Sequence, residues 1–328
     1  MPRTLVNELY QQMSLPVMSA PMFIVSGPEL VIAQCANGII GSMPALNARP
    51  QSMLAEWLTT IKSQLADLKQ REPGRTIAPY AVNHIIHKTN DRLQEDLATC
   101  ADHQVPLIIT SLRAPSDVVD TVHAWGGKVF HDVTTLRHAQ KALEAGVDGL
   151  ILVCSGAGGH AGTLSPFALL AEVRKIFDGP IALSGAISRG QDILAARAMG
   201  ADFAYMGTRF IASQEACAQE DYKQMLVNAQ ASDILYTPYF SGIPANYLKP
   251  SVVASGLDPN ELHTLKPGTS DFGAKHSKVW RDIWSAGQGV GSIDKVLPVA
   301  NIVDDLKQAY LHALEGLDDR FQASQTCQ

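Results

Sequence analysis

One histidine stands inside a glycine-rich segment that reads S-G-A-G-G-H-A-G from Ser155 to Gly162. Glycine lets a backbone approach a ligand closely and adopt positive φ angles. A histidine in such a segment, His160, can act as an acid or a base near neutral pH. The structural alternative is a flexible turn with an exposed histidine, and we favour the functional interpretation. The spacing is not G-x-G-x-x-G, so a Rossmann dinucleotide site is not predicted.

Two shorter glycine turns could bind a phosphate. They are Ser184-Gly185-Ala186 and Met206-Gly207-Thr208, and each lies at the end of a short apolar run. Backbone N–H groups in such turns, together with the N-terminus of a following helix, bind phosphate oxygens. The pair therefore favours a phosphate-bearing ligand, with tight turns that serve packing alone as the alternative.

Other polar residues give weaker signals. His84 and His87 are three residues apart but lack a third ligand at a useful spacing, so a metal-dependent hydrolase is not favoured. His131 and Asp132 are adjacent in an apolar run, and in a strand they would point to opposite sides. Asp132 is costly to bury unless it is hydrogen-bonded. The five cysteines show no C-x-x-C spacing, so we expect reduced thiols without disulfides or structural zinc.

Eight short and almost wholly apolar runs alternate with amphipathic segments. Such runs are typical of strands buried on both faces, as in a parallel sheet. The expected strands are Leu15–Ala20, Ile39–Met43, Ala78–Asn83, Leu107–Thr110, Lys128–Asp132, Leu150–Val153, Ile181–Ser184 and Phe203–Met206.

The amphipathic segments have recognisable helix ends. Pro28 and Pro166 each stand at a first helical position, and Ser188 with Gln191 matches a capping box. Glycine follows three of the expected helices, at Gly126, Gly146 and Gly200.

Eight β–α units in about 210 residues favour an α/β (β/α)8 TIM barrel over an open doubly wound sheet with a miscounted strand. The rhythm breaks after Arg209. We predict that residues 1–210 form the barrel, that 211–296 form a small C-terminal cap insertion over its mouth, and that 297–328 form a helix that closes the barrel. Further helices are expected at 217–229, 275–284 and 297–317. In such a barrel the active site lies at the C-terminal ends of the strands.

Composition excludes several classes of protein. The 328 residues are 46% apolar and 18% charged, with a net charge of −6. This is typical of a globular protein without a basic surface for nucleic acid or anionic membrane. No apolar run approaches the length of a membrane span, and Met1–Gln12 has no apolar signal-peptide core. We therefore expect a cytoplasmic protein, either a monomer or a homodimer.

The motifs together match one family. Its carriers are Ser19-Ala20-Pro21-Met22, Val82-Asn83, the A-G-G-H-A-G run that ends at Gly162, Ser184-Gly185-Ala186, Met206-Gly207-Thr208-Arg209-Phe210 and Trp284-Ser285-Ala286-Gly287-Gln288-Gly289. On these motifs the chain resembles the nitronate monooxygenases, also called 2-nitropropane dioxygenases, along nearly its whole length. These are FMN-binding barrels, related to FMN-dependent enoyl-acyl-carrier-protein reductases and NAD(P)H:quinone reductases.

The resemblance implies roles for individual residues. It places Pro21, Met22 and Phe23 along the flavin ring, Asn83 at the ring's polar edge, and Gly158 and Gly159 against the flavin. It assigns the FMN phosphate to Ser184, Gly185, Ala186, Gly207 and Thr208. His160 would be the catalytic base, and Gln288 would approach the pocket from the C-terminal loop.

Three positions depart from the family's pattern. Gly156 stands where many members have Glu, Ala186 ends a turn that often reads S-G-G or A-G-G, and Asp132 replaces Lys, Ser or Thr. Asp132 would therefore lie near the flavin, where a carboxylate opposes a reduced anionic ring. These differences leave the flavin prediction intact and bear on the substrate.

The resemblance implies an FMN-dependent oxidoreductase that oxidises alkyl nitronates with O2 to a carbonyl compound and nitrite. Neutral nitroalkanes are a second substrate if His160 removes their proton. The alternative within the fold is an NAD(P)H-dependent flavin reductase that acts on quinones or enoyl thioesters. A phosphate-binding barrel without flavin, either an isomerase or a ligand-binding protein, is the alternative from another class.

Overall fold

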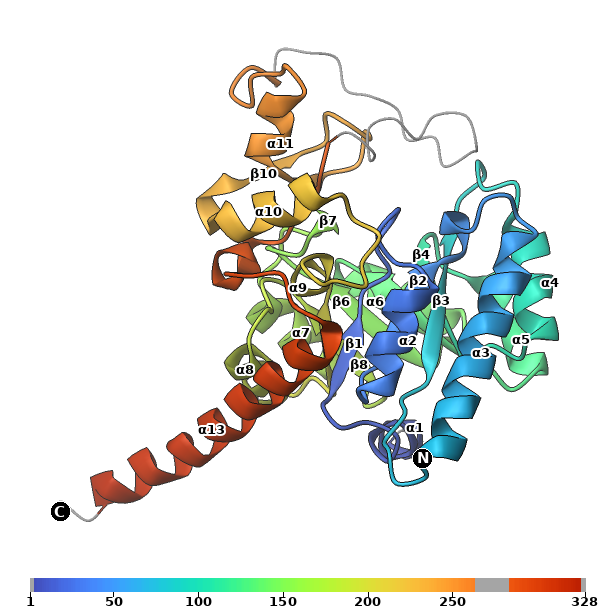
Figure 1. The fold of residues 1–328 in the computed structure, drawn as a ribbon, viewed down its shortest axis with the longest axis horizontal. Helices are drawn as coiled ribbons and strands as arrows, with labels where there is room; N and C mark the ends of the chain where they lie inside the picture. Colours follow the sequence, from blue (N-terminus) through green and yellow to red (C-terminus); the bar gives the residue numbers. More distant parts are fainter. Residues whose placement is uncertain (1–2, 263–282, 326–328) are drawn as a thin grey trace.

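The computed structural model describes residues 3–262 and 283–325, and its centre is a barrel of eight parallel strands (Figure 1). The strands follow the order β1-β9-β8-β6-β5-β4-β3-β2, and a bridge between Met18 and Ile40 joins the first to the last. Their bounds are β1 (Val17–Ser19), β2 (Gly41–Pro44), β3 (Tyr80–Ile86), β4 (Leu107–Leu112), β5 (Lys128–Val133), β6 (Gly149–Val153), β8 (Ile181–Ser184) and β9 (Phe203–Met206). The prediction of a TIM barrel is confirmed.

Each strand begins and ends where its residues pair by hydrogen bonds with a neighbouring strand. The two last strands, β8 and β9, coincide with the predicted runs. At the first strand, β1 begins at Val17 and not at Leu15, and the intervening Pro16 has no N–H to donate. The third strand continues past Asn83 to Ile86 because His84, Ile85 and Ile86 pair with β4.

Helices cover the outside of the barrel. They are α2 (Pro28–Ala36), α3 (Met53–Arg71), α4 (Leu93–Asp102), α5 (Ser116–Ala124), α6 (Leu136–Glu144), α7 (Pro166–Arg174) and α8 (Gly190–Ala198). The first-turn prolines are confirmed, and the three terminating glycines have φ angles of 85°, 85° and 103°. The predicted capping box is wrong: the carboxylate of Asp192, not Gln191, accepts the N–H groups of Ser188 and Arg189.

The lower end of the barrel is closed by side chains and by α1 (Thr4–Tyr10). Phe130 and Phe203 are fully buried inside the barrel, and the Tyr10 ring meets Phe203 edge-on with centroids 5.4 Å apart. Arg3 and Arg174 both bind the carboxylate of Asp202 beside this contact. The C-terminal ends of the strands therefore form the end of the barrel that is left for a ligand.

The segment after the barrel packs at that opposite end (Figure 1). It contains α9 (Thr208–Ile211), α10 (Glu220–Asn228), β10 (Ile234–Thr237), β11 (Ala245–Leu248) and α11 (Lys249–Ala254). A short strand of the glycine-rich loop, β7 (Gly159–His160), joins β10 and β11 in a three-stranded sheet. The cap and the loop are thus hydrogen-bonded to each other. The helix predicted at 275–284 falls almost entirely outside the described residues.

The last helix, α13 (Val299–Gln325), packs on α8 and α2 with Ile302, Leu306 and Tyr310 buried. The helix expected at 297–317 is therefore present and extends farther, and its end projects away from the barrel (Figure 1). Within the described part of the chain, no helix has both the length and the apolar character that crossing a membrane requires.

Candidate active site

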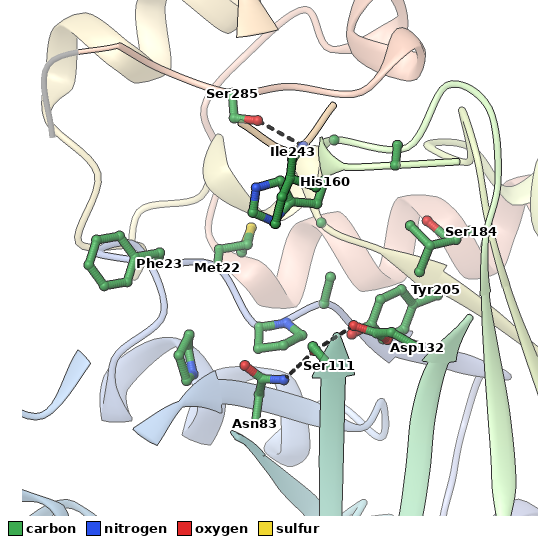
Figure 2. Close-up of a pocket in the computed structure, with 18 of the residues that line it drawn as sticks. Met22, Phe23, Asn83, Ser111, Asp132, His160, Ser184, Tyr205, Ile243 and Ser285 are labelled. Carbon is green, nitrogen blue, oxygen red and sulfur yellow. Dashed lines mark hydrogen bonds between the residues drawn. The ribbon is translucent and has the colours of Figure 1, made fainter. Parts of the chain in front are cut away.

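A pocket of about 640 Å³ lies at the C-terminal ends of the barrel strands (Figure 2). This volume is within the usual range for a small-molecule or cofactor site. The pocket brings together most of the residues singled out from the sequence: Pro21, Met22, Phe23, Asn83, Asp132, Gly158, Gly159, His160, Ser184, Gly207 and Thr208.

The other three, Gly185, Ala186 and Gln288, lie behind this lining. The N–H groups of Ala186 and Gln288 both donate to the carbonyl oxygen of Gly156, at 3.2 and 2.8 Å. Gly185 has a φ of 134°, and a Cβ there would lie 2.7 Å from the Ser155 oxygen. These residues hold the loops of the pocket against one another, and their predicted contact with a phosphate stays a prediction.

The floor of the pocket is a chain of three polar side chains from three neighbouring strands. The amide of Asn83 on β3 donates to the Ser111 hydroxyl on β4 at 2.8 Å, and Ser111 donates to Oδ2 of Asp132 on β5 at 2.7 Å (Figure 2). Parallel register places successive strand ends side by side, which is why residues so far apart in sequence meet here. The arrangement fixes the orientation of the Asp132 carboxyl.

Burial changes the charge of that carboxyl. It raises the pKa of Asp132 to about 7, and the hydrogen bond from Ser111 opposes the rise only in part. The second oxygen, Oδ1, is buried and has no hydrogen-bond partner among the described residues. Tyr205 lies beside it on β9, and burial together with the nearby carboxyl raises the phenol's pKa (Figure 2). The floor thus holds one carboxyl that changes charge near neutral pH.

His160 enters the pocket from the side opposite this floor (Figure 2). Its backbone lies in β7, opposite Ala245 of β11, and its Nε2 is 3.1 Å from the Ser241 hydroxyl. That hydroxyl also donates to the Ile243 oxygen, an arrangement in which it accepts from the N–H at Nε2 of the ring. Burial lowers the pKa of His160 to about 4, so the ring is neutral at pH 7.

The segment around Ser285 ties the glycine loop to the cap. The N–H of Gly159 donates to Ser285 Oγ at 2.8 Å, and Ser285 Oγ donates to the Asn246 oxygen at 2.5 Å. Nearby, the N–H of Gly287 donates to Thr208 Oγ1 at 2.9 Å. The C-terminal segment at Ser285–Gly287 is thus bonded to the glycine loop, to β11 and to Thr208. These bonds hold the glycine loop in place.

The outer part of the pocket is mainly apolar. It is lined by Phe23, Leu46, Ile85, Leu112, Ile243 and Pro244. The guanidinium of Arg49 lies 5.3 Å from the centre of the Phe23 ring and also lines the pocket. This part can take an apolar substituent with an anionic or polar group near its rim.

The lining residues that were not among the predicted site residues include Ser111, Tyr205, Ser285 and Arg49. Ser111 stands at the end of an expected strand, and active sites of such barrels lie at the C-terminal ends of the strands, so it could have been predicted. Tyr205 could have been found from strand alternation, since every second residue of β9 faces the interior. For Arg49 the sequence carries no comparable signal, because only the folded chain brings it to Phe23.

The lining fits a flat ring better than a metal ion. In the ranges 3–262 and 283–325, no group of three or more His, Cys, Asp or Glu side chains could hold a metal. Gly158 is an exposed residue of the lining, and its missing Cβ lets the loop pack closely on Gly287, where a Cβ would lie 3.0 Å from the nitrogen. The side chains of Asn83 and Asp132 add polar groups to the floor of the pocket. Glycine backbone on one side and a polar floor suit a planar heteroaromatic group.

Fold and pocket together define a (β/α)8-barrel enzyme with a site for such a group at the barrel mouth. Comparison with known families agrees: residues 7–309 match the nitronate monooxygenase family model, and the chain belongs to this family. It is therefore an oxidoreductase, and a flavin is the cofactor that the family implies.

The chain is similar to named proteins at low identity. It is 26% identical over 353 residues to a nitronate monooxygenase of Paraburkholderia phytofirmans, covering 92% of this chain and 94% of that protein. It is 27% identical over 239 residues to a protein of Mycobacterium tuberculosis named as a monooxygenase. That match covers 66% of this chain and 63% of the relative, so it spans less than two thirds of the relative's length.

Solved structures share the fold. A mutant FabK from Thermotoga maritima has a TM-score of 0.77 and 24% identity, covering 98% of this chain and all of that one. A nitroalkane oxidase from Streptomyces ansochromogenes has a TM-score of 0.76 and 23% identity, covering 94% and 99%. At these identities the likeness shows the fold alone.

Proposed function

We propose that the chain is an FMN-dependent oxidoreductase that oxidises alkyl nitronates with O2 to a carbonyl compound and nitrite. The observation that carries the proposal is the pocket at the strand ends, which gathers the glycine loop, His160 and the polar floor in a member of this family. The flavin, when bound, would supply the redox step, and the protein supplies binding, orientation and exclusion of water.

The pocket divides into parts that suit the parts of FMN. Gly158 and Gly159 offer backbone to one face of the ring, with Met22 among the facing residues. Asn83 and Asp132 would meet its polar edge. Ser184, Gly207 and Thr208 lie where the two phosphate turns reach the lining, and Gly185 and Ala186 support them from behind.

The electrostatics of His160 favour a nitronate over a neutral nitroalkane. A general base works best when its pKa lies near the working pH. His160 has a pKa of about 4, so it is a weak base for a carbon acid at pH 7. A nitronate arrives already deprotonated and needs only to be oriented, which a neutral imidazole and the rim residue Arg49 can do.

Steady-state turnover with propyl nitronates, run beside NAD(P)H with a quinone, tests the proposal. We expect a yellow protein that consumes O2 and releases nitrite only with the nitronate. Anaerobic mixing with NADPH separates the alternative on the same barrel: rapid bleaching of the flavin would identify an NAD(P)H-dependent reductase of quinones or enoyl thioesters. The apolar outer wall at Leu46, Ile85 and Leu112 is the feature that favours this alternative. A colourless protein would contradict both.

A further inference from the structure

We propose that Asp132 takes up a proton when a flavin in this pocket is reduced, and that Ser111 and Asn83 position the carboxyl for that role. The inference rests on the proposed function, since it needs a flavin in the pocket. It concerns a residue that departs from the family's pattern, so it describes this chain.

In the floor of the pocket each side chain donates a hydrogen bond to the next, from Asn83 to Ser111 and from Ser111 to Asp132. Asn83 donates to Ser111 through Nδ2 at 2.8 Å, so the hydroxyl proton of Ser111 goes to Asp132 Oδ2 at 2.7 Å. This leaves Oδ1 buried and unpaired within the described residues, on a residue that lines the pocket. A charged carboxylate in that position has one hydrogen bond in place of the several it would have in water, and such a group is stabilised by protonation.

The described residues beside Asp132 include no Arg or Lys side chain. The polar side chains that contact it or face it across the pocket include Ser111 on β4, Asn83 on β3, Tyr205 on β9 and His160 on β7, and the titratable His138 on α6 lines the same pocket. Burial keeps Tyr205 and His160 neutral at pH 7. The adjacent His131 points to the other side, to Thr110 Oγ1 at 2.8 Å, and its pKa is lowered to about 4. Among the described lining residues, Arg49 is the one Arg or Lys side chain, and it lies over Phe23.

Reduction of a flavin makes a second negative charge beside this carboxylate unfavourable. When dithionite or a nicotinamide supplies two electrons, a bound flavin ring that gains one proton would carry one negative charge. A further proton from solvent then forms an O–H bond on Asp132, and no other bond of the residue changes. Two like charges in a site of low polarity repel strongly, so the pKa of Asp132 must be higher in the reduced state. It already lies near 7 without that charge.

The sign of the expected pH dependence follows directly. Below pH 6 the carboxyl is neutral in both redox states, so Asp132→Asn should change the reduction equilibrium little. Above pH 7 the wild type must take up one additional proton on reduction. Its reduction equilibrium constant should therefore fall relative to that of Asp132→Asn by about tenfold for each pH unit.

The experiment is a reductive titration of the purified holoenzyme with dithionite against reference dyes, from pH 5.5 to 8.5. Flavin absorbance is read for the wild type, Asp132→Asn and Ser111→Ala. Ser111→Ala keeps the carboxyl but removes a bond that stabilises its charged form, so the divergence should begin at a higher pH. Asp67→Asn changes the same charge on the exposed face of α3, 63% exposed, and should follow the wild type.

Parallel plots of the reduction equilibrium constant against pH for the wild type and Asp132→Asn would overturn the inference. They would mean that Asp132 keeps one charge state throughout, for example because its carboxylate accepts a hydrogen bond from a ring N–H. Coincident curves would overturn it as well and would place the carboxyl away from the ring. In both cases the absorbance still shows a flavin, so the proposed function survives. Protein that purifies without flavin would overturn both. If Asp132→Asn does not fold, the displacement of the Ser111→Ala curve decides.

Discussion

His160 and Asp132 line the same pocket, and burial makes both of them neutral in different ways. The imidazole loses its proton easily, with a pKa of about 4, whereas the carboxyl retains its proton up to about pH 7. Desolvation disfavours whichever form is charged, so it lowers the pKa of a base and raises that of an acid. At the residue scale the buried groups of the site therefore carry less charge at neutral pH than they would in water, which suits the anionic nitronate that we propose as substrate.

Replacement of His160 by Asn separates a base from a positioning group. If His160 removes a proton, turnover of neutral nitroalkane should fall by a factor of about 10², the lower end of the range for general bases, because its pKa is far from the working pH. Turnover of the nitronate should fall much less. Initial rates with both substrates on flavin-loaded protein provide the measurement. Equal losses on both would show that His160 orients the ligand, and no loss on either would remove it from the site.

The pH profile of the nitroalkane reaction gives an independent check on the same residue. The lowered pKa means that the neutral base is present above about pH 4 and is lost as the pH falls through that value. The wild-type rate should therefore rise around pH 4, and the Asn variant should lack this step. A step near pH 6.5 in the wild type would show that the histidine is solvated in the working enzyme.

At the scale of elements, glycine positions decide where loops can meet a ligand. Gly207 follows β9 and faces Ala20 and Met22 across the pocket, where a Cβ would lie 3.3 Å from the Ala20 Cβ. Gly287 joins the C-terminal segment to the glycine loop, where a Cβ would lie 2.7 Å from the Gly156 oxygen. A side chain at Gly207 would reduce the space beside Ala20 and Met22. A side chain at Gly287 would push the C-terminal segment away from the glycine loop.

Gly207→Asp should abolish flavin retention. It adds a carboxylate to a turn that we propose to bind phosphate through backbone groups, so like charges and lost space both oppose binding. Gly207→Ala is the matched control, since its Cβ meets only side-chain atoms and should leave substantial flavin bound. The ratio of flavin absorbance to protein absorbance after purification provides the measurement. Full occupancy in the Asp variant would place the phosphate elsewhere.

Gly287→Ala should weaken both the fold and flavin binding. Its Cβ would meet the backbone of Gly156 and Gly158, which cannot move as a flexible side chain does. We expect a loss of about 1–3 kcal/mol in the free energy of unfolding, the usual cost of overpacking. Gly74→Ala, where a Cβ meets nothing within 4 Å, is the control. Urea denaturation of both variants tests the expectation, and equal stability would contradict it.

At the scale of the whole molecule, the barrel leaves one end for ligand and closes the other. The plug of α1, Phe203 and Asp202 occupies the lower end, and the cap sheet with β7 covers part of the mouth. The division into a barrel at 1–210, a cap at 211–296 and a closing helix at 297–328 stays a prediction. The pairing of β7 with β11 ties the glycine loop to the segment that follows the barrel.

We expect the cofactor to be FMN and not FAD. The turns at Gly185 and Gly207 are short and suit one terminal phosphate, and the barrel provides no Rossmann segment for an adenosine diphosphate half. Heat release followed by chromatography of the supernatant identifies the cofactor. Recovery of FAD would contradict the expectation and would require a second phosphate site outside the two turns.

Mild acid should destabilise the protein through its buried histidines. His84, His131 and His160 are buried, and their pKa values are lowered to about 3, 4 and 4. Between pH 6.5 and pH 4 the unfolded chain binds these three protons and the folded chain does not. Asp132 and Asp96 oppose this, because burial raises the folded pKa of both carboxyls. The free energy of unfolding should fall with pH by about 1.4 kcal/mol per unit for each net proton.

Urea denaturation of the flavin-free protein at pH 7.0, 6.0 and 5.0 measures this slope. His84→Gln is an informative variant, because it removes one of the three protons at a position outside the pocket. Its stability should depend less steeply on pH than that of the wild type. Stability that rises as the pH falls through this range would show that Asp132 and other buried carboxyls outweigh the histidines.

The sequence alone determined the barrel and most of the site, because both depend on local patterns. Buried parallel strands need continuous apolar runs, so β8 and β9 could be read to the residue. The barrel rule then placed Asn83, Asp132, Ser184 and Thr208 at one end. The glycine loop around His160 was visible because glycine is needed where backbone meets a ligand.

Only the tertiary structure decided what depends on side chains from distant segments. The pairing of His160 with Ser241, the contact of Arg49 with Phe23 and the tie from Gly159 to Ser285 join residues 26 to 126 positions apart. No periodicity encodes such pairs, since two depend on how the segment after the barrel packs on it and the third on how two barrel loops meet. The charge of Asp132 belongs here too. Its pKa is set by desolvation and by Ser111, and desolvation exists only once the surrounding strands have closed.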